Sequence, residues 1–107
     1  MKYKKCLFLI PMSYNDRREI PAVLIDAIFD DLYMNFGGHT IDGITEGTWK
    51  MEDGGKAIDR CYKVWIIISE EKISALKDLI RKFARLLEQE AIYFEVMDAD
   101  VEFIGPE

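Results

Sequence analysis

Two runs of the chain are apolar at both odd and even positions. The first extends from Lys4 to Ile10 and ends at Pro11, and the second extends from Cys61 to Ile68 and is rich in β-branched and aromatic residues. Because successive side chains of a strand point to opposite faces, such runs are typical of strands that are covered on both sides. We therefore expect these two runs to be the central strands of one sheet.

Two other segments have the three- and four-residue apolar spacing of amphipathic helices. The first begins near Ile20-Pro21, where proline suits a first helical turn, and ends at Gly37-Gly38, where glycine suits a C-terminal cap. The second follows Ser69 and the acidic pair Glu70-Glu71, which favour the positive end of a helix dipole. Its apolar stripe is made of Ile73, Leu76, Ile80, Phe83 and Leu87. Both stripes are expected to face the core.

The remaining segments complete a sheet. Residues 39 to 51 are typical of an extended strand near an edge, in which glycines weaken pairing and often mark bulges. Glu52 to Gly55 form a strong turn signal, so this strand and the run at Cys61 are expected to form a hairpin, with a loop that ends at Gly55 or extends to Asp59 at most. Ala91 to Val96 predict a fourth strand. A turn at Asp98-Ala99-Asp100 would then precede an optional short fifth strand over Val101 to Ile104.

The resulting order, βαββαβ, predicts a single α+β domain over residues 1–107. Short connections and right-handed crossovers favour the ferredoxin-like sandwich, an antiparallel sheet with two helices on one face and the first and third strands in the middle. Those two strands are the most apolar runs in the chain, so the topology and the composition agree.

The sheet face without helices should be polar, yet the sequence predicts otherwise. Trp65, Ile67 and Tyr93 would face away from the helices, together with either Leu7 and Leu9 or Cys6, Phe8 and Ile10. Such a patch would cover roughly a few hundred Å², more than a soluble monomer usually exposes. Three interpretations compete: stacking into a homo-oligomer such as a dimer or trimer, a small-molecule site between subunits, and base stacking on nucleic acid.

Composition argues against the third interpretation. The net charge is −6 and the basic residues include no RNP1-like run, so nucleic acid is an unfavourable partner. No apolar stretch approaches a membrane span, and the apolar residues before Pro11 are too few for a secretory signal, so we expect a soluble, cytoplasmic protein. Cys6 and Cys61 are expected to be buried thiols, and no metal or cofactor is predicted.

The candidate ligand-binding residues are Trp49, Trp65 and Tyr93 as walls and His39 and Glu46 as orienting groups. His39 is the only histidine, and its position differs in parity from that of Glu46, which would place the two on opposite faces of a regular strand. Gly54-Gly55-Lys56 lacks the spacing of a phosphate loop. No nucleophile, base and orienting group can be assembled from spacing.

The leading hypothesis is therefore a non-enzymatic oligomeric module, assembled through its sheet face, that binds a small ligand or a protein partner. One alternative is a small hydrolase or isomerase with His39 as general base and a carboxylate from Glu46 or Glu90. A second alternative is an acidic inhibitor of phage type that sequesters a nucleotide signal or blocks a host protein.

Four short segments resemble a pattern of short uncharacterised bacterial and phage proteins, written F-G-G-x-T, G-x-W, D-G and Q-E-A. They are Phe36-Gly37-Gly38-His39-Thr40, Gly47-Thr48-Trp49, Asp53-Gly54 and Gln89-Glu90-Ala91. The resemblance implies a ferredoxin-like fold and transfers no catalytic residue. The chain is also loosely similar to nitrogen-regulatory PII-like proteins in length, element order and the long connection between the second and third strands. Their nucleotide-binding signatures are absent from this sequence, whereas a trimeric architecture stays open.

Overall fold

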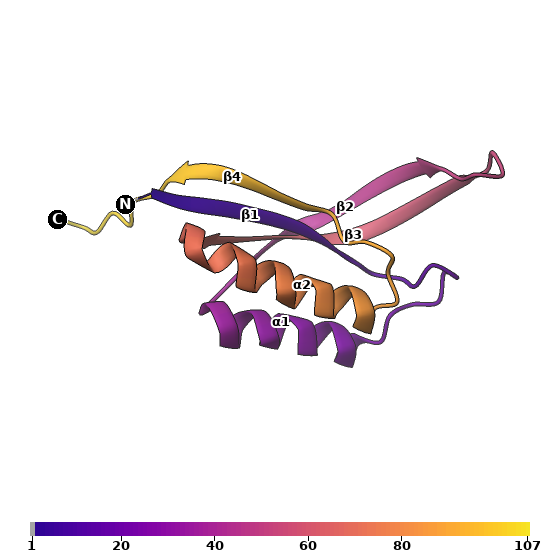
Figure 1. Cartoon of the computed structure of the whole chain (residues 1–107), viewed down its shortest axis with the longest axis horizontal. Helices are drawn as coiled ribbons and strands as arrows, with labels where there is room; N and C mark the ends of the chain where they lie inside the picture. Colours follow the sequence, from indigo (N-terminus) through magenta and orange to yellow (C-terminus); the bar gives the residue numbers. More distant parts are fainter. Residues whose placement is uncertain (1) are drawn as a thin grey trace.

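The computed structural model describes residues 2 to 107. In chain order the elements are β1 (Lys2–Pro11), α1 (Ala22–Phe36), β2 (Thr40–Lys50), β3 (Lys56–Ile68), the short 3-10 helix η1 (Glu70–Lys72), α2 (Ile73–Leu86) and β4 (Phe94–Asp100). The strands form one antiparallel sheet in the order β2-β3-β1-β4, and both helices lie against the same face of it (Figure 1). This confirms the predicted ferredoxin-like arrangement, with β1 and β3 in the middle.

The core lies between this sheet and the two helices. Phe8 of β1 pairs with Val64 of β3 on one side and with Phe94 of β4 on the other, so one row of side chains faces the helices across three strands. The helices contribute their apolar stripes, and the largest fully buried side chains include Phe8, Ile10, Ile28, Leu32, Ile66, Leu76, Phe83 and Leu87. The predicted stripe of α2 is buried apart from Ile73, which is partly buried, so the helical spacing identifies most of the core residues of that helix. In α1 the buried Ile25 lies outside the predicted stripe, and Ala27, which the spacing had included, is exposed.

The ends of α1 follow the predicted signals. The helix begins directly after Pro21, and Gly37 ends it in the left-handed conformation at φ 78°. The Gly37 amide donates a hydrogen bond to the carbonyl oxygen of Tyr33 at 2.8 Å. Glycine adopts this conformation without the steric penalty that a Cβ atom brings. No helix in residues 2 to 107 is long and apolar enough to cross a membrane.

The fourth strand differs from its prediction. β4 begins at Phe94 and includes Asp98 to Asp100, which the sequence had indicated as a turn. The reason is that β1 begins as early as Lys2, so its residues 2 to 8 supply hydrogen-bonding partners along the whole of β4. Because β4 is an edge strand, its aspartates can remain exposed. Residues 101 to 107 contain no strand, so the optional fifth strand is wrong.

The hairpin formed by β2 and β3 is longer than expected and projects beyond the helices (Figure 1). β3 begins at Lys56 and not near Cys61, so the connection does not extend to Asp59. The turn closes between Met51 and Gly55, whose amide and carbonyl groups are 2.9 Å apart, and the Asp53 carboxylate accepts a bond from the Gly55 amide at 2.8 Å. We call residues 44 to 60 of this hairpin the arm.

A β-bulge changes which residues of β2 share a face. Ile41 pairs with Val64 and Ile44 pairs with Tyr62, so β2 uses three residues where β3 uses two. Gly43 lies inside this irregularity at φ +84°, a conformation that side chains with a Cβ atom rarely adopt. The bulge reverses the parity of the strand beyond it. Glu46 therefore lies on the helix side of the sheet, as His39 does, which corrects the expectation of opposite faces.

Candidate functional site

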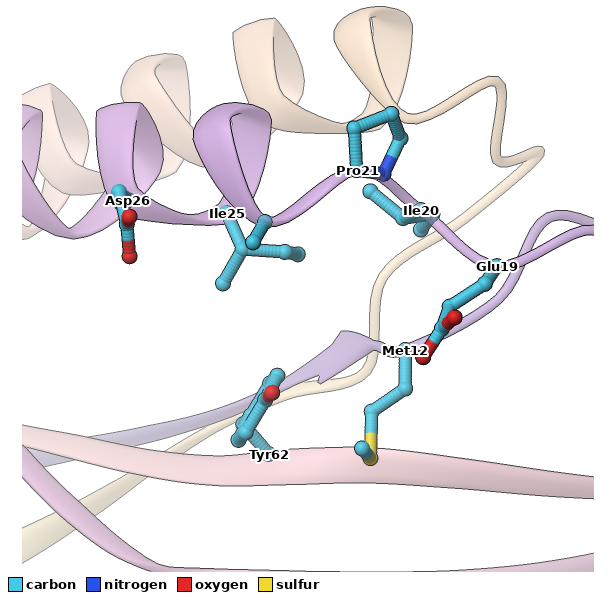
Figure 2. Close-up of a pocket in the computed structure, with 8 residues that line it drawn as sticks. Met12, Glu19, Ile20, Pro21, Ile25, Asp26 and Tyr62 are labelled. Carbon is cyan, nitrogen blue, oxygen red and sulfur yellow. The ribbon is translucent and has the colours of Figure 1, made fainter.

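A cavity of about 280 Å³ opens between the N-terminal end of α1 and strand β3 (Figure 2). It is lined by Met12, Glu19, Ile20, Pro21, Ala22, Ile25, Asp26 and Tyr62. Figure 2 shows Ile25 and Asp26 pointing from α1 toward β3, and Tyr62 standing on β3 opposite them. Small-molecule pockets usually span about 300 to 1,000 Å³, so this cavity is near the lower limit of that range.

The loop after β1 forms one side of the cavity because it folds back on itself. The Ile20 amide donates a hydrogen bond to the Met12 carbonyl at 3.1 Å, and the Met12 amide donates to the Arg60 carbonyl of β3 at 3.0 Å. The Tyr14 amide donates to the Arg18 carbonyl at 2.8 Å, which closes the loop. These bonds hold residues 12 to 20 as a small ordered hairpin that places Glu19 and Ile20 beside α1.

The neighbouring arginine is engaged within that loop. The Arg18 guanidinium donates to the Asp16 carboxylate at 2.6 Å and lies 4.8 Å from the centre of the Tyr14 ring. This hydrogen bond lowers the pKa of Asp16 and raises the pKa of Arg18. Arg18 is therefore bound to Asp16 and Tyr14, and it does not line the cavity.

The lining combines negative charge with apolar walls. It contains the carboxylates of Glu19 and Asp26 but no lysine, arginine or histidine. Across residues 2 to 107, neither carboxylate takes part in an ion pair or a side-chain hydrogen bond. Ile20, Ile25 and the ring of Tyr62 supply the apolar part. Such a lining suits a ligand that has both a cationic group and an apolar or aromatic group.

An aromatic row extends from the cavity along α1. The ring of Phe29 meets Tyr62 edge-on with centroids 5.9 Å apart, and it stacks on the His39 imidazole at 5.1 Å. The Nδ1 atom of His39 is shielded from solvent and has no hydrogen-bond partner. His39 thus supports the wall through Phe29 and does not itself line the cavity.

A general base must reach the proton that it removes, and His39 does not line the cavity, so a His39→Ala variant should keep any catalytic activity that the cavity supports. Loss of the stacked imidazole should lower the free energy of unfolding by about 1 kcal/mol. Chemical denaturation and an activity assay on the same preparation measure both effects. Loss of turnover in a variant that remains folded would instead support His39 as the base.

The five residues selected from the sequence lie in three regions of the chain. Trp65 and Tyr93 are on the sheet face without helices, where the Tyr93 hydroxyl donates to the Glu95 carboxylate at 2.8 Å. Trp49 is on the arm with its indole ring against Gly47, and Glu46 is on the arm opposite Arg60. His39 lies beneath the sheet against α1. None of the five lines the cavity, and their role in ligand binding stays a prediction.

The uncovered sheet face contains apolar residues, as the sequence indicated. Leu7 and Leu9, and not Cys6, Phe8 and Ile10, lie on it beside Trp65 and Ile67, although Leu7 is only 8% exposed. Charged side chains interrupt the patch, however. The Lys5 ammonium lies 4.7 Å from the centre of the Trp65 ring, and Lys63 and Glu95 occupy neighbouring positions. The face is therefore mixed in character and is not a continuous apolar surface.

A second depression of about 510 Å³ lies at the opposite end of the sheet. Its lining is Tyr3, Lys4, Glu70, Asp98, Ala99 and Asp100, and the Lys4 ammonium is paired with Asp98. No group of three or more histidine, cysteine, aspartate or glutamate residues in the described part of the chain is placed to hold a metal ion. Because its lining has no large aliphatic side chain, this depression suits a ligand with an apolar part less well than the cavity at α1 does.

The two cysteines lie on opposite sides of the sheet. Cys6 is fully buried toward the helices, and Cys61 is half-buried on the other face. Burial raises the pKa of both thiols. Both residues are free cysteines, but the predicted burial is complete only for Cys6.

No protein-family model and no curated protein matches this sequence. Among solved structures, the fold is similar to that of a phage SAM lyase in complex with S-methyl-5'-thioadenosine, with a TM-score of 0.63 and 13% sequence identity. The alignment covers 97% of this chain and 93% of the lyase chain. This match to an enzyme contradicts the hypothesis of a non-enzymatic binding module, which is wrong. The chain thus shares the α+β fold of a ligand-binding phage enzyme over nearly its whole length.

Proposed function

We propose that this protein is a lyase that cleaves S-adenosylmethionine and releases S-methyl-5'-thioadenosine. The observation that carries the proposal is the fold similarity over 97% of the chain to a SAM lyase that has this thioether bound. The cavity at α1 gives independent support, because its two carboxylates and its aromatic wall suit a ligand with a sulfonium group. The net charge of −6 also favours a cationic substrate.

The reaction requires one bond to break at the sulfonium centre. The bond between sulfur and the γ-carbon of the amino acid breaks, and its electron pair remains on sulfur, which becomes a neutral thioether. The substrate's own carboxylate can displace the sulfur at this carbon and close a five-membered lactone. Atoms and charge then balance without water or an external base. An enzyme can accelerate such a step largely by holding the substrate in the reactive conformation.

The residues around the cavity match the parts of this substrate. Glu19 and Asp26 can pair with the sulfonium and ammonium groups, and the face of the Tyr62 ring can lie against the sulfonium. No side chain caps the start of α1 at Pro21, where the amide groups and the positive end of the helix dipole favour the substrate carboxylate. The cavity therefore offers a complementary group for each charge of the substrate.

Incubation of the purified protein with S-adenosylmethionine tests the proposal. Chromatography should show S-methyl-5'-thioadenosine at a rate proportional to protein concentration, and proton NMR should show the ring signals of a lactone. Heat-denatured protein is the control for the slow spontaneous decay of this substrate. Vinyl protons would instead indicate an elimination by a base, and a rate equal to that of the control would contradict the proposal.

We also propose that the enzyme works as a homo-oligomer. Ile44, Trp49 and Ile58 on the arm are each more than half exposed, and a projecting two-stranded hairpin is marginally stable without a partner surface. Sedimentation velocity at micromolar concentration should therefore give a multiple of the 12.5 kDa chain mass. A single species with the mass of one chain would contradict the proposed homo-oligomer.

A cytoplasmic location belongs to the same proposal, because two free cysteines are typical of a reducing compartment.

A further inference from the structure

We propose that Glu19 and Asp26 make the cavity select the cationic substrate over its neutral product, so that loss of the sulfonium charge promotes release of the thioether. This inference rests on the proposed lyase function and adds a specificity role for two residues. It concerns the equilibrium between bound and free ligand and is separate from the chemical step.

The placement of the two carboxylates carries the inference. Glu19 comes from the end of the ordered loop and Asp26 comes from the second turn of α1, yet both border the same cavity (Figure 2). Neither is neutralised by a basic side chain in the described part of the chain, because the nearest arginine in the sequence, Arg18, is paired with Asp16. Two unpaired carboxylates therefore face the space that a ligand would fill.

The apolar part of the lining helps the negative charge of the two carboxylates to discriminate between a cationic and a neutral ligand. Ile20 is 4% exposed and Ile25 is 7% exposed, so the wall beside the carboxylates is largely withdrawn from water, whereas Glu19 and Asp26 themselves are exposed until a ligand covers them. A positive charge on the ligand is attracted more strongly where less water screens it. The substrate has this charge on its sulfur and the thioether product does not, whereas the adenosine part is common to both. The carboxylates should consequently contribute to binding of the substrate and little to binding of the product.

Two non-reactive ligands isolate this contribution. Sinefungin carries a cationic amine at the position of the sulfonium and has no sulfur–carbon bond to cleave, and S-adenosylhomocysteine has a neutral sulfur at the same position. Both contain the same adenosine and amino acid groups. Calorimetric titration should show that the wild-type protein binds sinefungin more tightly, on the order of tenfold. The ratio of the dissociation constants of S-adenosylhomocysteine and sinefungin should fall close to one in the Glu19→Gln, Asp26→Asn double variant.

A double variant that removes the same number of charges elsewhere is the matched control. Asp30→Asn on α1 and Glu102→Gln in the C-terminal segment change exposed residues that do not line the cavity. This variant should keep the wild-type preference for sinefungin. A thermal unfolding scan establishes that each variant is folded, and the two single substitutions replace the double variant if that variant is unstable.

The outcomes separate this inference from the proposed function. Equal affinity for the two ligands in the wild-type protein, or an unchanged preference in the Glu19→Gln, Asp26→Asn variant, overturns the inference. If S-methyl-5'-thioadenosine is still formed from S-adenosylmethionine in that case, the lyase function stands. Failure to bind either ligand together with the absence of thioether formation overturns both.

Discussion

Replacement of Ala22 by tryptophan is expected to lower the rate of thioether formation by about 100-fold or more, because small displacements of a substrate can cost that much. Ala22 is the first residue of α1 and lines the cavity, but its side chain is exposed and does not belong to the core. An indole ring at this position can therefore enter the cavity without displacing a buried side chain. The chromatographic assay for S-methyl-5'-thioadenosine measures the effect.

The same substitution five residues further along α1 provides the control. Ala27 is also exposed but does not line the cavity, so Ala27→Trp should leave the rate within about twofold and stability within about 0.5 kcal/mol of the wild-type values. Unfolding transitions of the two variants should coincide. A fully active Ala22→Trp protein would show that the substrate binds elsewhere on the molecule.

The fold was largely predictable because its signals are local. The apolar runs at β1 and β3 identify the two strands that are covered most completely, and Gly37 ends α1 where the sequence places the cap. Hydrophobic periodicity and glycine conformations act over a few residues, so they can be read without knowledge of distant contacts. Errors arose where pairing with another strand decided the outcome, as in β4, whose aspartates remain extended opposite β1.

The cavity was not predictable in the same way. Tyr62 is separated from Asp26 by 36 positions in the sequence and meets it only because β3 lies beneath α1. Glu19 belongs to a polar segment that resembles any solvated loop, and its proximity to the Ile20-Pro21 helix start was the only local signal. Large aromatic residues such as Trp49 and Trp65 are conspicuous in a sequence and therefore attract attention before a structure is available. In the folded protein Trp49 lies on the arm and Trp65 lies on the sheet face without helices, so neither of them lines the cavity.

The bulge in β2 illustrates a further limit of sequence patterns. Alternation along a strand holds only while the pairing register is regular, and one additional residue moves every later side chain to the other face. Glycines such as Gly43 often mark bulges, but the position of a glycine in the sequence does not tell where the register shifts. The relation between His39 and Glu46 could therefore be settled only by the paired strands.

Replacement of Phe83 by alanine is expected to lower the free energy of unfolding by about 3 to 5 kcal/mol, the usual cost of removing a buried aromatic side chain. Phe83 is fully buried in α2 and belongs to the cluster between the helices and the sheet. A domain of this size is stable by roughly 5 to 15 kcal/mol, so a third or more of the total would be lost. The melting temperature should fall by about 12 °C or more.

A Leu86→Ala variant tests whether the stability lost in Phe83→Ala comes from the core or from the helix itself. It lies one turn after Phe83 in the same helix but is 43% exposed, so Leu86→Ala leaves a much smaller cavity. Alanine has the highest helix propensity, and both substitutions favour the helix for that reason. If Leu86→Ala lowers the free energy of unfolding by less than about 1 kcal/mol, packing of α2 against the sheet is the main source of its stability. Equal losses would mean that the buried stripe of α2 is not what holds the helix on the sheet.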